Sequence, residues 1–142
     1  AGNRGKKAFV IYADMNNLKI INDRFGHEEG DYSLKLIAEI LKEVFGKDSI
    51  VGRFGGDEFA AFTYASDEKT AKSIRKQVSE VTRQKNEGNG KPYYVSMSVG
   101  ICEFECSRDL NLKDLMDKAD VDLYIEKKHK RSNVLKNDDE AI

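Results

Sequence analysis

Apolar residues along this chain follow two periodicities, which together predict a sheet covered by helices. A continuous apolar run at 8–13 is typical of a strand that is buried on both faces. Apolar positions at helical spacing predict amphipathic helices over about 30–45, 71–81 and 112–123. Apolar residues alternate with serine and glycine over 95–101, which predicts a half-buried strand.

A β-hairpin is predicted for residues 50–63, because two short apolar stretches there flank the turn Gly55-Gly56-Asp57-Glu58. Gly46 is expected to end the helix before this hairpin, and Asp67 is expected to cap the helix after it. Residues 134–135 are expected to add a short terminal strand. The order strand, helix, hairpin, helix, strand, helix indicates a mixed α/β fold in which helices cover a mixed sheet.

Composition narrows the class of protein. The 142 residues suffice for a single domain, 1–142, with one hydrophobic core. The chain has 24 Lys and Arg and 25 Asp and Glu, which gives a net charge of −1. This near-neutral charge argues against nonspecific binding to nucleic acid or membrane, without excluding a local basic pocket. The only cysteines, Cys102 and Cys106, are too few for a zinc site and are expected to be reduced thiols. No stretch approaches the ~18 apolar residues of a membrane span and no signal peptide is visible, so we expect a cytoplasmic location.

The turn at 55–58 is the strongest candidate for chemistry. Its glycines allow the backbone to take positive φ and let a ligand approach the main chain closely, while adjacent carboxylates suit a divalent cation. Asp14 follows the buried first strand, where ligand-binding sheets place functional side chains, although such an aspartate also caps turns. If the hairpin lies beside the first strand, Asp14 and Asp57 converge and can chelate Mg²⁺.

The segment 16–31 is rich in polar residues and is interpreted as a connector that leads into a helix. Asn22 and Asp31 suit the edge of a guanine, which both donates and accepts hydrogen bonds; the alternative for both is turn and helix-cap chemistry. His27 is expected to make a structural hydrogen bond. The basic run 127–131 either complements a helix end or neutralises a triphosphate. No P-loop, nucleophile elbow or zincin motif is present.

Taken together, these residues resemble the GGDEF family of diguanylate cyclases over about residues 8–134. The signature itself is Gly55-Gly56-Asp57-Glu58-Phe59, preceded by Arg53-Phe54. Three other blocks are similar to the family in the same order, namely N-D-x-x-G-H-x-x-G-D at 22–31, the fourth strand at 96–101 and A-D-x-x-x-Y-x-x-K at 119–127.

The resemblance implies a palm-like nucleotide-cyclase fold, with a mostly antiparallel central sheet flanked by helices and the signature on a β-hairpin. It implies an enzyme that joins two GTP into cyclic di-GMP and releases two pyrophosphates. Each domain presents one GTP, so a second GGDEF domain is the expected partner, as a homodimer. Mg²⁺ or Mn²⁺ is the expected cofactor.

The resemblance also assigns roles to residues of this chain. Asp14, Asp57 and the main-chain carbonyl of Met15 are the implied metal ligands, and Glu58 assists at the metal or activates the 3′-hydroxyl. The implied catalytic residues are therefore Asp14, Asp57 and Glu58. The implied substrate-binding residues are Asn22 and Asp31 at guanine, Asn17, Leu18, Lys19, Lys127 and Arg131 at the phosphates, and Gly55 and Gly56 in the signature turn.

Some positions depart from the family pattern. The common D-x-D is Asp14-Met15-Asn16 here, and Asn17 replaces an aromatic residue or histidine. Gly46 and Ser49 replace the R-x-x-D motif, so no inhibitory product site is expected. Lys130 replaces the glycine that usually precedes the conserved arginine.

The family's opening L-T-G-L-x-N-R block is absent, so the chain is expected to be a fragment of a longer sensor protein with a regulatory domain outside it. An active cyclase is favoured because the signature acids are intact. The alternative is a catalytically weak or inactive GTP-binding domain that regulates a partner. A polymerase-like palm is disfavoured by the near-neutral charge and small size. Contact with nucleic acid or membrane is not expected, and the domain is placed in the cytoplasm, free or as part of a membrane-bound sensor.

Overall fold

We describe a computed structural model of the chain, in which residues 6–47, 49–53, 55–65, 69–107, 109–129 and 134–136 are placed. The elements in chain order are β1 (Lys7–Met15), α1 (Leu18–Phe25), α2 (His27–Phe45), β2 (Ile50–Arg53), β3 (Glu58–Tyr64), α3 (Ala71–Asn86), β4 (Met97–Glu105) and α4 (Leu112–His129).

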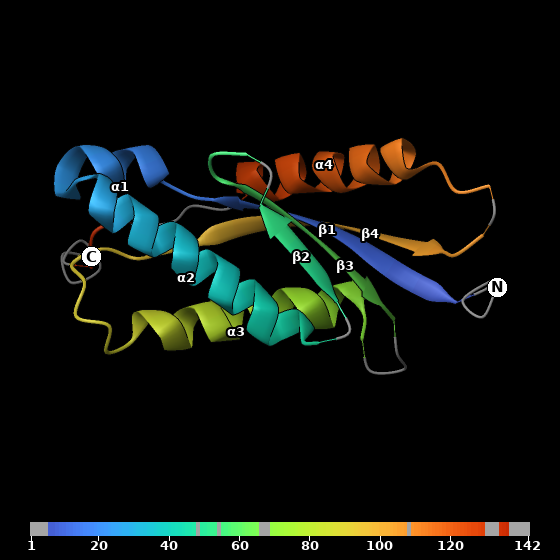
Figure 1. Cartoon of the computed structure of the whole chain (residues 1–142), viewed down its shortest axis with the longest axis horizontal. Coiled ribbons are helices and arrows are strands. Elements are labelled where there is room, and N and C mark those ends of the chain that lie inside the picture. The colour runs from blue at the N-terminus through green and yellow to red at the C-terminus, as the bar shows by residue number, and fades with distance from the viewer. Residues whose placement is uncertain are drawn as a thin grey trace.

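The four strands form one sheet in the order β2-β3-β1-β4, and every neighbouring pair is antiparallel. This confirms the mixed α/β class with an antiparallel sheet and the signature on the hairpin between β2 and β3. Strand β1 lies inside the sheet, between β3 and β4 (Figure 1). Its central position explains why its sequence is continuously apolar.

Helices cover both faces of the sheet, with α2 and α3 on one side and α4 on the other (Figure 1). Alternate residues of β1 serve the two faces, because successive side chains in a strand point in opposite directions. Phe9 and Ile11 belong to the large core with α2 and α3, whereas Val10 joins the smaller core under α4. By the same alternation Asp14 falls on the α4 side.

Helix α4 lies against β4 at Gly100. A Cβ added to Gly100 would lie 2.0 Å from the carbonyl oxygen of Ala119 and 2.4 Å from the amide nitrogen of Leu123. The glycine therefore lets the backbones of helix and strand meet directly. The predicted strand at 95–101 is displaced along the chain, to Met97–Glu105, because Val95 instead pairs its backbone with the side chain of Asn86.

The prediction of a connector at 16–31 was wrong, because α1 occupies part of it. Leu18, Ile21 and Phe25 recur at helical spacing and pack on the core, but the helix has only 8 residues. Gly26, with φ of 99°, then turns the chain directly into α2, which therefore begins earlier than predicted. Gly46 ends α2 as predicted, with φ of 74°.

Two smaller predictions changed. The N-cap of α3 is Thr70, whose side chain accepts from the amide of Ser73 in a capping box, while Asp67 lies outside the described residues. The expected terminal strand is a single bridge between Tyr93 and Leu135.

Candidate active site

The hairpin lies beside β1, so the condition under which Asp14 and Asp57 were expected to converge is met. In the antiparallel register Asp14 is opposite Glu58, and the amide of Met15 donates to the carbonyl of Asp57 at 2.9 Å. The carboxyl groups of Asp14 and Asp57 are close enough for Asp57 to perturb the titration of Asp14. The sheet thus brings the acid that ends β1 to the two acids of the signature.

Asp14 is a buried carboxylate whose charge is only partly balanced. Its residue is 8% exposed, its Oδ2 forms an ion pair with the ammonium of Lys127, and its Oδ1 is buried without a hydrogen-bond partner among the described residues. Burial raises the pKa of Asp14; Lys127 counteracts this and Asp57 adds to it. A buried carboxylate oxygen without a hydrogen-bond partner, close to a second carboxyl group, is suited to bind a hard cation.

Among the described residues, no group of three or more histidine, cysteine, aspartate or glutamate side chains lies together as a metal cluster. The two neighbouring carboxyl groups, of Asp14 and Asp57, offer oxygen donors. Oxygen is the donor type that Mg²⁺ and Mn²⁺ prefer, and Mg²⁺ commonly uses one or two carboxylates together with water and substrate phosphate. The donor set fits such an ion.

The signature turn is held by Arg53. Its Nε donates to the carbonyl of Gly55 at 3.2 Å and a terminal nitrogen donates to the carbonyl of Gly56 at 2.7 Å. Gly55 provides space in this turn, because a Cβ there would lie 2.9 Å from Oε2 of Glu58.

The chain leaves β1 through a tight turn into α1. Asn17 has φ of 64°, the one positive value among the described residues other than glycine, and its carbonyl accepts from the amide of Ile21. The first amides of any α-helix lack intrahelical acceptors and carry partial positive charge. Leu18 and the exposed Lys19 stand at this end of α1, near the end of β1.

Asn16, the residue that breaks the family's D-x-D pattern, anchors this turn to the segment leading into β4. Its amide nitrogen donates to the carbonyl of Ser96 at 2.9 Å, and its side-chain Oδ1 accepts from Ser98 at 3.0 Å. Sequence patterns gave no signal for this role, because the two segments are about 80 residues apart. The departure therefore has a structural use.

Asn22 lies where α1 packs against Gly30 of α2. A Cβ at Gly30 would lie 1.8 Å from Oδ1 of Asn22, so the glycine makes room for that side chain. The Oδ1 atom is buried and has no hydrogen-bond partner among the described residues. Asp31, the other candidate for guanine, is exposed and directly follows Gly30 on α2. The role of Gly30 was missed, although its fixed place in the N-D-x-x-G-H-x-x-G-D motif was the available signal.

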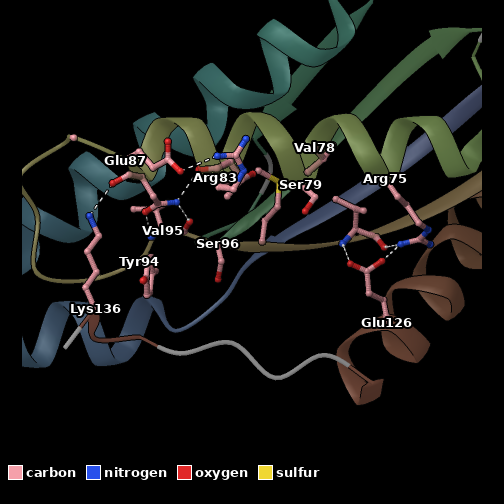
Figure 2. A pocket seen from close by; sticks show the side chains of 15 residues that line it. Arg75, Val78, Ser79, Arg83, Glu87, Tyr94, Val95, Ser96, Glu126 and Lys136 are labelled. Atoms are coloured by element: carbon pink, nitrogen blue, oxygen red, sulfur yellow. Dashed lines mark hydrogen bonds and ion pairs between the residues drawn. The ribbon is translucent and has the colours of Figure 1, made fainter. Parts of the chain in front are cut away.

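A cavity of about 380 Å³ opens between β1 and α4, beside Asp14. Its polar lining includes Asp14, Glu58, Asp120 and Lys127. A larger cavity, of about 790 Å³, lies along α3 and β4 and contains none of the candidate site residues (Figure 2). Arg131 lies outside the described residues.

Ser49, one of the residues that replace the family's R-x-x-D motif, has a structural role. The hydroxyl of Ser49 donates to the carbonyl of Phe45 at 2.6 Å and bonds the hydroxyl of Thr63 at 2.9 Å. These contacts tie the start of β2 to α2 and to β3.

The family model described as diguanylate cyclase, GGDEF domain, matches residues 1–133. The chain belongs to the GGDEF family. The diguanylate cyclase DgcP of Escherichia coli (strain K12) is 32% identical over 126 residues, which cover 88% of this chain and 37% of DgcP. The cyclic di-GMP phosphodiesterase NbdA of Pseudomonas aeruginosa is 27% identical over 130 residues, which cover 92% of this chain and 16% of NbdA.

Solved GGDEF domains share the fold. That of TpbB (YfiN) from Pseudomonas aeruginosa superposes with a TM-score of 0.73 at 29% identity, covering 89% of this chain and 74% of that chain. The palm-like cyclase fold implied by the sequence is thereby confirmed. This GGDEF chain spans only about a third or less of the two curated relatives above. None of its described helices is both long and apolar enough to cross a membrane.

Proposed function

We propose that this GGDEF domain is the catalytic domain of a diguanylate cyclase, which condenses two GTP into cyclic di-GMP. The observation that carries the proposal is the set of groups around Asp14: an adjacent Asp57, Glu58 opposite in the register, and Lys127 on its Oδ2. Phosphoryl transfer requires such a combination, because catalysis there consists mainly of positioning and charge stabilisation.

The residues would divide the substrate between them. Asp14, Asp57 and the carbonyl of Met15 would hold Mg²⁺ or Mn²⁺, which when bound neutralises charge that develops on the transferred phosphoryl group. Lys127 would contact the triphosphate. The amides of Asn17 and Leu18, together with Lys19, would bind phosphate at the start of α1.

Asn22 and Asp31 would recognise the base. The Asp31 carboxylate can accept from the N1–H and the N2 amino group of guanine, whereas adenine lacks both donors. This favours GTP over ATP. Gly55 and Gly56 would let the triphosphate approach the main chain of the signature turn. Arg131 is proposed as a further phosphate ligand from its place in the sequence alone.

In each half of the reaction, the 3′-hydroxyl of one GTP attacks the α-phosphorus of the other. An O–P bond forms, the bond to pyrophosphate breaks, and Glu58 is the proposed acceptor of the hydroxyl proton. The two halves give cyclic di-GMP and two pyrophosphates. Because each domain presents one GTP, we propose a homodimer, brought together by a regulatory domain outside this chain in a cytoplasmic protein.

A second candidate is a GTP-binding domain that regulates a partner without turnover. The likeness to NbdA favours considering it, because that relative is named for a phosphodiesterase activity. Under this alternative the same residues bind GTP and no product forms.

The test is to fuse the chain to a dimerising module, add GTP and Mg²⁺, and quantify cyclic di-GMP by chromatography. Asp57→Asn is expected to abolish product through loss of a metal ligand, whereas Asp109→Asn, the same change at an exposed residue outside the site, is expected to leave it unchanged. Bound GTP without product from the unsubstituted fusion would refute the cyclase and support the regulatory domain.

A further inference from the structure

The edge of the sheet formed by β4 is covered by side chains rather than by another strand. Strand β4 is an outer strand, so the backbone groups on its far side lack a strand partner. The carbonyl of Val99 accepts from Arg75 at 2.8 Å, its amide donates to Glu126 at 3.2 Å, and the amide of Ile101 donates to Asp122 at 2.8 Å. Charged residues of α3 and α4 therefore satisfy this edge.

Arg75 joins the two helices at this point. Its guanidinium forms ion pairs with both Asp122 and Glu126 and also donates to the carbonyl of Val99 on β4. Figure 2 shows Arg75 and Glu126 pointing toward one another. The side chains of Arg75 and Glu126 are only 33% and 20% exposed, so their interaction is partly shielded from water. We call Arg75, Asp122 and Glu126 the edge clamp.

The edge clamp acts on the helix that carries Lys127. Asp122 and Glu126 are four residues apart and share one face of α4. Lys127 is the next residue, about 100° further around the helix, and its ammonium pairs with Asp14. Both acids occupy open positions of the A-D-x-x-x-Y-x-x-K motif, so the clamp belongs to this chain's own sequence.

Apolar packing and charged contacts together hold α4 on the sheet. Leu115 and Ala119 pack in the smaller core, and at Gly100 the backbones of helix and strand meet directly. Asp122 and Glu126, bonded to backbone amides of β4 and to Arg75, add a restraint on the rotation of the helix and on its position along the strand. A small rotation there would withdraw Lys127 from Asp14.

We propose that Arg75 is a positioning residue for the nucleotide site, acting through Glu126 and Asp122 to hold Lys127 in place for the triphosphate. This rests on the proposed function, in which Lys127 contacts phosphate. Arg75 itself lines the larger cavity on α3 and is not among the residues that line the cavity at Asp14.

The test measures binding of Mg²⁺ with a GTP analogue whose α,β-bridging carbon prevents cleavage, by calorimetry on the full chain. Arg75→Met is expected to weaken binding about tenfold, the effect of losing one charge-assisted hydrogen bond. Arg75→Lys should recover part of this loss, because lysine keeps the charge but lacks the fork that reaches two acids and a carbonyl. Arg83→Met is the matched control, because Arg83 lies on the same helix and the same cavity but pairs with Glu87 of its own segment.

A double-mutant cycle with Lys127→Met separates positioning from general stability. If Arg75 acts through Lys127, Arg75→Met should change binding less than twofold in the Lys127→Met background. An equal loss in both backgrounds, or no loss from Arg75→Met alone, would overturn the inference while leaving the proposed function intact. A parent chain that fails to bind the analogue would overturn both.

Arg75→Met removes the cation that lies between the carboxylates of Asp122 and Glu126, and two like charges four residues apart on a helix destabilise it. If the variant does not fold, Arg75→Met is combined with Asp122→Asn and Glu126→Gln, which removes every charge of the edge clamp. This triple variant then replaces Arg75→Met in the double-mutant cycle with Lys127→Met. An equal loss of binding in both backgrounds, or no loss from the triple variant alone, would again overturn the inference. Thermal unfolding of each variant verifies that the proteins compared are folded.

Discussion

Replacing Gly30 by alanine should separate the stability of this domain from its recognition of guanine. Gly30 is buried in the first turns of α2, where it faces α1. The added Cβ would lie 1.8 Å from Oδ1 of Asn22, 2.8 Å from its Cγ and 3.3 Å from Cδ1 of Leu18. Asn22 has to move, whereas Leu18 has to shift by only a few tenths of an ångström.

Two opposing contributions of Gly30→Ala to the free energy of unfolding nearly cancel. Alanine is favoured over glycine by about 1 kcal/mol within a helix. Turning Asn22 away costs about 0.5–1.5 kcal/mol if its new rotamer is strained, and no hydrogen bond of Oδ1 to the described residues is broken. The free energy of unfolding should therefore stay within about 1 kcal/mol of the parent, while guanine nucleotide binding falls about tenfold through loss of the Asn22 hydrogen bond.

The assay combines urea unfolding with nucleotide binding for Gly30→Ala, Asn22→Ala and the double variant. Once Asn22 is truncated the clash disappears, so Gly30→Ala should stabilise that background by about 1 kcal/mol and leave its binding unchanged. Undiminished binding by Gly30→Ala, when Asn22→Ala binds about tenfold more weakly, would refute the proposed coupling of Gly30 to Asn22. A loss of stability beyond about 3 kcal/mol would show that backbone packing, not one side chain, sets the contact.

Three further predictions concern the frame around the site. Gly100→Ala should destabilise the domain by about 1–3 kcal/mol, because its Cβ meets backbone of α4 that cannot turn aside; Gly52→Ala, with nothing within 4 Å of its Cβ, is the control in thermal unfolding. Burial raises the pKa of Tyr93 from 10.0 to about 12. The folded state thus favours the neutral phenol. The free energy of unfolding should therefore be unaffected by Tyr93 below pH 10.0 and should fall by about 1.4 kcal/mol per pH unit between pH 10.0 and about 12. Urea unfolding across this range should show a shallower decline for Tyr93→Phe. Thr70→Ala should cost about 1 kcal/mol through loss of the capping box that starts α3, and a change below about 0.3 kcal/mol in urea unfolding would contradict that role.

Local pattern was sufficient for most of the elements. Three of the four helices, the hairpin and β1 follow from apolar periodicity and turn residues, since these features act over a few neighbouring positions. Helix α1 was not predicted, because its two turns carry as many polar residues as apolar ones and one of its four apolar residues, Ile20, is exposed. The limits of β4 were not predicted, because the side chain of Asn86 on α3 bonds the backbone of Val95 in place of a neighbouring strand.

For the site, the sequence by itself determined the chemistry on offer: two acids beside two glycines at a turn, an acid at a strand end, and a lysine on the last helix. Only the tertiary structure decided how these groups act. Antiparallel register places Asp14 opposite Glu58, and helix packing brings Lys127 to Asp14 across 113 positions. Burial then leaves Oδ1 of Asp14 without a hydrogen-bond partner among the described residues and raises the pKa of Asp14, whereas Gly55 provides space beside Glu58. The physical reason is that the chemistry of each side chain is given by its residue type, while its desolvation and its charge contacts depend on which distant segments pack together.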